Sequence, residues 1–302
     1  MHRSGTGPAR ANPLGVHALV WTGGTDRDAL AGAVESTRAA GYDLLELSLH
    51  DPESLDVDAT RRAAEAAGLD LACSRGLGFD ADPSSPDPEI AARGERALAD
   101  SVRMARDLGA GRVAGALYSA LGKYGRPDDP RGRERAVAAL ARIADQASAA
   151  GIELGLEVVN RYESNVVNTA EQGLQLIDEV GAPALKLHLD TYHMNIEEDD
   201  LVRPVLRAGD RLGYVHVGEN HRGYLGSGHL DFGSFFHALA DVGYAGPVTF
   251  ESFSSAVVAP GLSHDLAIWR DLWSDGDDLA RHAREYVANQ LRAAGSGGSA
   301  AG

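Results

Sequence analysis

The sequence has one cysteine, two lysines and no long apolar run, and each shortage excludes a class of protein. Cys73 cannot form an internal disulfide, and no Cys/His spacing typical of a zinc site occurs, so we expect a buried, inert thiol. A membrane-spanning helix is not expected, because no stretch of about 20 uncharged apolar residues is present. The first twelve residues also lack an apolar signal core, and we therefore expect a cytoplasmic protein.

Positive charge is also scarce, with 28 Lys and Arg residues against 44 Asp and Glu residues and a formal net charge of −16. Nucleic acids and anionic membranes bind basic surfaces, so neither is expected as a partner. The low lysine content and the lack of a glycine-rich phosphate loop favour an uncharged substrate over a phosphorylated one. A small polar molecule or a divalent cation is compatible with this acidity.

Short segments rich in Val, Leu and Ile alternate with helical patterns, which are clearest over residues 27–40, 95–108, 133–150 and 169–180. Eight such repeats fit a closed (β/α)8 barrel, whereas a doubly wound sheet would carry a glycine-rich phosphate turn that is missing here. We therefore predict a single-domain α/β protein, a (β/α)8 TIM barrel over residues 13–294, with disordered tails at 1–12 and 295–302. Its expected strands are Gly15–Trp21, Leu44–Leu49, Leu69–Ser74, Arg112–Leu117, Ile152–Val158, Leu185–Asp190, Gly213–Val217 and Pro247–Glu251.

Two connecting segments, residues 78–89 and 119–131, are longer than a turn requires and are rich in proline, glycine and acidic residues. In a barrel both would follow the carboxyl ends of strands, where loops build the active site. For any single residue within them, a tolerated surface position is the simpler interpretation.

Four potential metal ligands lie at or near the ends of four successive predicted strands. Glu157, Asp190, His216 and Glu251 are separated by 33, 26 and 35 residues, each close to the length of roughly 30 residues of one βα unit. Residues placed in this way recur at one level of the barrel mouth and point to a common centre. A single carboxylate at a strand end is more often a helix cap, but four in phase predict a cation site.

Alternation along the strands supports this placement. Glu153, Gly155 and Glu157 share one face of the fifth strand, and the polar face of the sixth strand carries Lys186, His188 and Asp190. These faces point into the barrel, because the other faces pack on helices. We expect an interior ion pair between Lys186 and Glu153, and a structural role for His188.

Three carboxylates and one imidazole form an oxygen-rich site that suits Mn²⁺ or Mg²⁺, with Co²⁺ as a further alternative. Two further positions of an octahedral ion would accept adjacent carbonyl and hydroxyl oxygens of a sugar. The cation would then stabilise the enediolate that forms when the neighbouring carbon loses its proton. A carboxylate on each face of that planar intermediate could remove a proton from one side and return one on the other, inverting the stereocentre.

Four segments of the second half carry distinctive motifs: GLEVVNRYE (155–163), KLHLDTYHMNIEE (186–198), HVGENHR (216–222) and GPVTFESF (246–253). They resemble the D-tagatose/D-psicose (allulose) 3-epimerase family of sugar isomerase/epimerase-like TIM barrels. The resemblance is strong over about residues 150–255 and looser from Gly15 to Leu121. It implies an isomerase-class, metal-dependent ketose 3-epimerase of carbohydrate metabolism that forms a dimer or tetramer.

The resemblance also implies roles for individual residues. Glu157, Asp190, His216 and Glu251 would hold the divalent metal, usually Mn²⁺ in the family, and Glu157 and Glu251 would exchange protons at C3. Expected substrate contacts are Glu163, His193 and Arg222, an apolar wall at Phe253, and the pocket residues Ala116 and Leu117. Glu46 resembles a glutamate common in the wider superfamily, with a salt bridge as the equal alternative. Departures at His17, Leu121 and around His221 bear on which sugar is bound.

Other functions stay open on the residues alone. The same site could move a proton between C1 and C2 as an aldose–ketose isomerase, or serve a related lyase or dehydratase. An apurinic endonuclease-like enzyme would need more metal ligands and a basic surface. A non-catalytic sugar-binding barrel would not need both Glu157 and Glu251 beside the metal.

Overall fold

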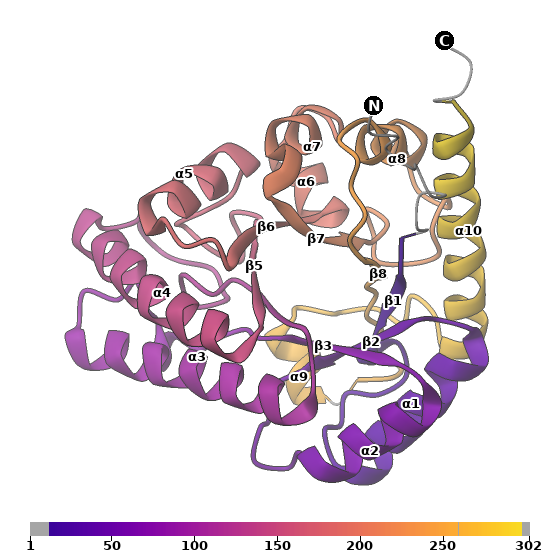
Figure 1. Cartoon of the computed structure of the whole chain (residues 1–302), viewed down its shortest axis with the longest axis horizontal. Coiled ribbons are helices and arrows are strands. Elements are labelled where there is room, and N and C mark those ends of the chain that lie inside the picture. Colours follow the sequence, from indigo (N-terminus) through magenta and orange to yellow (C-terminus); the bar gives the residue numbers. More distant parts are fainter. Residues whose placement is uncertain (1–11, 259, 298–302) are drawn as a thin grey trace, which may run out of the picture.

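The computed structural model describes residues 12–258 and 260–297 and shows eight parallel strands closed into a barrel in sequence order. The helices surround the barrel, with α3 and α4 side by side on one flank and α10 on another (Figure 1). The predicted (β/α)8 barrel is confirmed. The strands are β1 (Leu14–His17), β2 (Leu44–Ser48), β3 (Asp70–Ser74), β4 (Arg112–Gly115), β5 (Glu153–Glu157), β6 (Leu185–Asp190), β7 (Leu212–Val217) and β8 (Val248–Phe250).

Most helices begin at a side-chain cap, and five end at a glycine in the left-handed conformation, which costs glycine little. Helices α3 and α4 start earlier than the periodicity predicts, because Asp87 and Asp129 cap them and a proline occupies the first turn of each. The helices are α1 (Arg27–Ala40), α2 (Val57–Ala67), α3 (Pro88–Leu108), α4 (Pro130–Ala150), α5 (Ala170–Val180), α6 (Thr191–Glu197), α7 (Arg203–Ala208), α8 (Phe232–Asp241), α9 (Pro260–Asp265) and α10 (Gly276–Gly297), with short 3₁₀ turns at Ala18–Val20, Phe79–Ala81 and Gly209–Arg211.

Two strands end two or more residues before their expected ends. The first ends at His17, because the His17 ring accepts a hydrogen bond from the Leu19 amide and caps a 3₁₀ turn. The fourth ends at Gly115, whose φ of +129° suits glycine alone. A side chain at Gly115 would also place its Cβ 2.2 Å from the carbonyl oxygen of Arg75.

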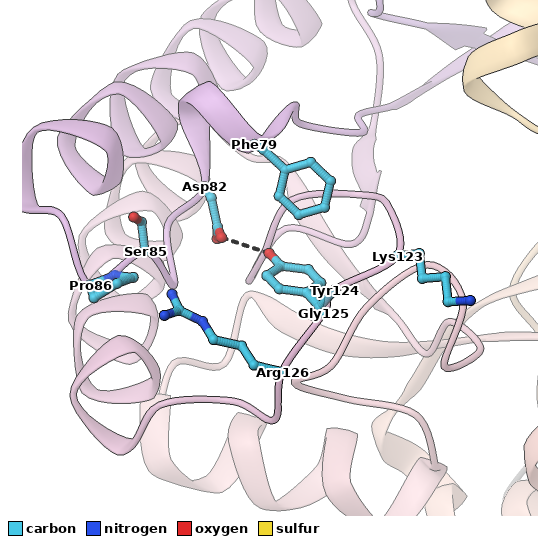
Figure 2. Close-up of a pocket in the computed structure, with 8 residues that line it drawn as sticks. All are labelled: Phe79, Asp82, Ser85, Pro86, Lys123, Tyr124, Gly125 and Arg126. Atoms are coloured by element: carbon cyan, nitrogen blue, oxygen red, sulfur yellow. Dashed lines mark hydrogen bonds between the residues drawn. The ribbon is translucent and has the colours of Figure 1, made fainter.

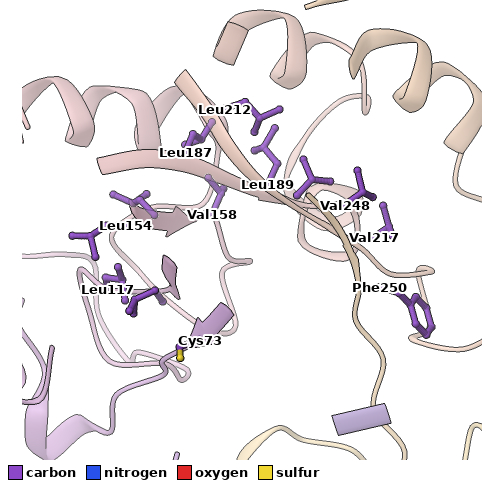
Figure 3. Packing of buried hydrophobic residues seen from close by; sticks show 14 of the residues in the cluster. Cys73, Leu117, Leu154, Val158, Leu187, Leu189, Leu212, Val217, Val248 and Phe250 are labelled. Atoms are coloured by element: carbon purple, nitrogen blue, oxygen red, sulfur yellow. The ribbon is translucent and has the colours of Figure 1, made fainter. Parts of the chain in front are cut away.

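The apolar faces of the strands pack outward against the helices, as Figure 3 shows for Leu154, Leu187 and Val248. Cys73 belongs to this core, and burial raises the pKa of its thiol, as expected for an inert cysteine. Inside the barrel a second, separate apolar cluster forms a middle layer from Leu44, Ala72, Ala114 and Tyr214. On β5, Glu153 and Glu157 lie on either side of Gly155, the register partner of Ala114, and His188 on β6 is the register partner of Tyr214.

Most of the two predicted tails lies outside the described residues, at 1–11 and 298–302. The described residues extend slightly beyond the predicted boundaries of the barrel. The Asn12 side chain donates hydrogen bonds to the carbonyls of Tyr244 and Gly246, and α10 continues to Gly297. Within the described ranges, no helix is both long and apolar enough to cross a membrane.

Candidate metal centre and active site

The structure brings the four expected ligands together at the carboxyl ends of β5 to β8. Each of Glu157, Asp190, His216 and Glu251 offers a donor atom, and these atoms all lie within 4.8 Å of one another. Asp190 ends β6 and His216 lies in β7, and the two are paired in register across neighbouring strands. Glu251 lies one residue beyond β8, so the strand end and not the strand itself positions it.

The orientation of His216 fits a cation site. Its Nε2 lies 2.7 Å from Oε2 of Glu46, and its Nδ1 lies 3.5 Å from Glu251 Oε2 and 3.9 Å from Glu157 Oε1. Nδ1 is buried and has no hydrogen-bond partner among the described residues. An unpaired imidazole nitrogen that faces carboxylates is the arrangement that a divalent cation completes.

Burial and neighbouring charges shift the pKa values of Glu157 and Glu251 in opposite directions. Burial raises the pKa of Glu157 well above its usual range, and the carboxylates of Glu251 and Asp190 add to the rise. Burial alone would raise the pKa of Glu251 as well, but Arg222 and His216 hold it well below the usual range. A cation among the carboxylates would favour the ionised form of both.

His188 lies in the barrel interior, as the alternation of β6 predicts. It is fully buried, and neither ring nitrogen has a hydrogen-bond partner among the described residues. Burial lowers its pKa well below the usual value, so the ring is neutral. A donor atom of His188 also lies within 4.8 Å of donor atoms of Glu157 and His216, so the ring borders the cation site from below.

His193 lies beside the ligands and presents a hydrogen to them. Its Nδ1 accepts hydrogen bonds from the side-chain and backbone nitrogens of Asn160, at 2.8 and 3.3 Å. The hydrogen is therefore on Nε2, which lies 3.7 Å from Glu157 and 3.9 Å from Glu163. We missed Asn160 in the sequence, although it lies only three residues beyond Glu157. It also donates a hydrogen bond to Glu163, at 2.8 Å.

Arg222 lies directly over the ligand carboxylates, in the left-handed conformation with φ of 59°. Its guanidinium nitrogens lie 2.9 Å from a carboxylate oxygen of Glu251 and 3.0 Å from one of Asp190. The central guanidinium carbon, Cζ, lies 4.1 Å from the ring centre of Tyr192 and 4.8 Å from that of Phe253. Burial would lower the pKa of Arg222, but the two carboxylates raise it, so the side chain is a fixed cation.

The other expected substrate contacts lie at two depths. Phe253 is partly exposed beside Arg222, with its ring edge to face with His17 at 6.4 Å between centres. Ala116 and Leu117 are buried just after β4 and belong to the apolar core, in which Figure 3 shows Leu117. Their part in lining the pocket stays a prediction.

The two long connections meet each other at the surface. Together they line a cavity of about 440 Å³ (Figure 2), in which the Tyr124 hydroxyl donates a hydrogen bond to Asp82 at 2.6 Å and the Phe79 ring packs edge to face on Tyr124. The four expected ligands are not part of its lining. The second connection still reaches the site, because the Gly122 amide donates to the carbonyl of Glu163.

The predicted ion pair between Lys186 and Glu153 is not formed at close range. Glu153 lies 3.7 Å from Arg112, its register partner on β4, and the Lys186 ammonium lies 3.4 Å from the carbonyl of Asp210. The physical reason is the register, because Lys186 is level with Gly155, two residues above Glu153. Lys186 still acts at a distance, since it lowers the pKa of Glu153 after the larger effect of Arg112.

A closed barrel with three carboxylates and a histidine at the carboxyl ends of its strands defines a class, the metal-site (β/α)8 barrel enzymes. The family model described as "Xylose isomerase-like TIM barrel" matches residues 34–290. The chain belongs to this family and, within it, to the ketose 3-epimerases. The resemblance read from the four sequence segments is thereby confirmed.

Named relatives cover almost the whole chain. A ketose 3-epimerase of Arthrobacter globiformis is 49% identical over 93% of this chain and 97% of its own length. An L-ribulose 3-epimerase of Methylomonas sp. is 49% identical over 90% and 96%. A crystal structure of D-allulose 3-epimerase from Methylomonas sp. in complex with D-allulose has a TM-score of 0.91 and 47% identity, covering 93% of this chain and 98% of that one.

Proposed function

We propose that the chain inverts C3 of a free ketose by transferring protons between the sugar and two glutamates, Glu157 and Glu251. The observation that carries the proposal is the convergence of these two carboxylates with Asp190 and His216 in one buried cluster. The relatives named for ketose, L-ribulose and D-allulose 3-epimerisation support the same reaction. We expect Mn²⁺ as the cofactor, with Co²⁺ or Mg²⁺ as alternatives, because the donors are mainly carboxylate oxygens.

The two glutamates act as general base and general acid. One removes the C3 proton, which leaves a planar cis-enediolate, and the other returns a proton to the opposite face. A bound divalent cation would polarise the carbonyl and stabilise the negative charge that develops on the sugar oxygens.

The surrounding residues hold the sugar in place. His193 offers an Nε2 hydrogen, Arg222 offers a fork of donors, and Glu163 offers an acceptor, a set suited to neighbouring carbonyl and hydroxyl oxygens. Phe253 provides an apolar surface for the distal carbons. Their fixed positions would restrict the sugar to one geometry at C3.

The test is incubation of the Mn²⁺-loaded protein with a panel of ketoses in D₂O, analysed by NMR. We expect an epimer that carries deuterium at C3, because the returned proton comes from a glutamate that has exchanged with solvent. Deuterium at C1 or C2 with an aldose product would replace the proposal with an aldose–ketose isomerase. Sugar binding without any exchange would reject catalysis altogether.

A further inference from the structure

Glu46 is a buried carboxylate that none of the proton-transfer steps uses. It lies on β2, is fully buried, and contacts His216 on β7 across the barrel interior. We propose that Glu46 is a positioning residue that fixes the tautomer and the orientation of His216 and thereby raises the affinity for the divalent cation. The inference rests on the proposed metal site but not on which sugar reaction follows.

The hydrogen-bond pattern fixes where the protons lie. Oε2 of Glu46 is 2.7 Å from His216 Nε2 and also accepts a hydrogen bond from the Tyr214 hydroxyl at 2.5 Å. A carboxylate oxygen that accepts from a hydroxyl also accepts from an imidazole N–H, so the hydrogen of His216 is on Nε2. Nδ1, which faces Glu157 and Glu251 and has no hydrogen-bond partner among the described residues, is then the nitrogen left for a cation.

Glu46 is itself held from several strands. Tyr214 on β7 also contacts the Thr249 hydroxyl on β8, at 2.7 Å. On the other side, His17 Nε2 lies 3.9 Å from Oε1 of Glu46 and 3.0 Å from the Ser74 hydroxyl. The His17 hydrogen is on this nitrogen, because Nδ1 accepts from the Leu19 amide. Glu46 therefore cannot turn away from His216 without breaking contacts to the neighbouring strands.

These contacts determine what a loss of the carboxylate would do. A carboxylate on the outer nitrogen of a metal-binding histidine stops the ring from rotating and makes the inner nitrogen a stronger donor. Removing such a partner typically weakens metal binding by about 10–100-fold. Among the described ligand residues, His216 is the one to which Glu46 is hydrogen-bonded, so the effect should appear in cation affinity before it appears in proton transfer.

The experiment compares Glu46→Gln with a matched control, Glu153→Gln, in the full-length protein. The control makes the same change in the same barrel, but Glu153 contacts Arg112 and not His216. Free Mn²⁺ is measured by EPR during titration without any sugar, and the fold of each variant is checked by circular dichroism and thermal melting. We expect about 10–100-fold weaker Mn²⁺ binding for Glu46→Gln and a change below about threefold for the control.

A folded Glu46→Gln protein that binds Mn²⁺ within twofold of the wild type would overturn the inference. If that variant fails to fold, Glu46→Asp keeps the charge but withdraws it by one methylene, and unchanged affinity there would overturn the inference equally. If the wild-type protein binds no Mn²⁺, the proposed metal site is absent and the inference is overturned with it. Mn²⁺ binding that depends on Glu46, combined with no exchange in any ketose, would reject the proposed reaction and leave the inference standing.

Discussion

The barrel interior carries ionic groups at two levels, separated by the apolar middle layer. The upper level, at the carboxyl ends of the strands, contains the carboxylates of Glu46, Glu157, Asp190 and Glu251 beside the single guanidinium of Arg222. The lower level contains Glu153 with Arg112 and Lys186. β5 and β6 contribute residues to both levels.

The levels differ in how their charge is balanced. The lower carboxylate has cations of its own chain nearby, and its side chain keeps 35% of its exposure, so water also solvates it. Among the described residues, the upper carboxylates are largely buried and close together, and burial with the carboxylates of Glu251 and Asp190 raises the pKa of Glu157 well above its usual range. The lower level is therefore balanced within the protein, whereas a cation from solution would stabilise the ionised carboxylates of the upper level.

The largest expected effect is at Glu251, in the upper level. The functional distinction between the two levels would fail if Glu251 could be neutralised without loss of turnover. We expect Glu251→Gln to lower kcat by about 10²–10⁴-fold, because it removes one of the two proton-transfer groups. The measurement is ketose conversion at saturating Mn²⁺, with bound metal quantified in the same sample. Undiminished turnover with metal bound would contradict the acid/base assignment.

Addition of a cation should stabilise the upper level and, with it, the whole domain. At a free Mn²⁺ concentration of about 100 times Kd, we expect the free energy of unfolding to rise by about 2.7 kcal/mol. Denaturant melts with and without Mn²⁺ would measure this rise, with Asp190→Asn as the control in which it shrinks. Equal melts for the wild type would indicate that the carboxylates do not bind the cation.

Replacement of arginine by lysine should affect KM differently at the two levels. We expect Arg222→Lys to raise KM about tenfold, a loss of roughly 1.4 kcal/mol, because lysine lacks the planar fork of donors. Arg112→Lys, its counterpart in the lower level, should leave KM unchanged. Steady-state kinetics on both variants tests this, and an equal rise in the two would remove the functional distinction between the levels.

The smallest effect should come from Glu153. Burial raises its pKa above the model-compound value of 4.5, although Arg112 and Lys186 act in the opposite direction. Because the folded protein binds this proton more tightly, the stabilisation is present at low pH and is lost as pH rises above 4.5 through the folded-state pKa. We expect Glu153→Gln to change the free energy of unfolding by less than about 1 kcal/mol at pH 7. Denaturant melts across this pH range should show the variant gaining on the wild type as pH rises; a large loss of stability would contradict the prediction.

The sequence predicts the features that depend on the alternation of residues along one strand or on the length of the βα repeat. The in-phase spacing of Glu157, Asp190, His216 and Glu251 predicts their convergence, because each repeat of a barrel returns the chain to the same level. The alternation of β5 and β6 predicts in the same way that Glu153 and His188 face inward. The (β/α)8 architecture follows from the eight repeats.

The features that the sequence does not reveal depend on contacts across the barrel or on register. Glu46 and His216 are 170 residues apart, and only closure of the barrel makes them neighbours. The expected Lys186–Glu153 pair fails because register, which no spacing rule supplies, sets Arg112 beside Glu153 instead. Asn160 was missed because an asparagine after a strand usually signals a turn, and its contact with His193 appears only in three dimensions.

The hydrogen bond between Glu46 and His216 has a consequence for the order of events during synthesis and folding. Contacts of such long sequence separation form late, because a long loop must be closed before they contribute. The four ligand strands β5 to β8 pair with their neighbours in sequence, but the contact of His216 with Glu46 forms only when the β2 segment reaches it. The part of the cation affinity that we assign to Glu46 would therefore be acquired only when the ring of strands is complete.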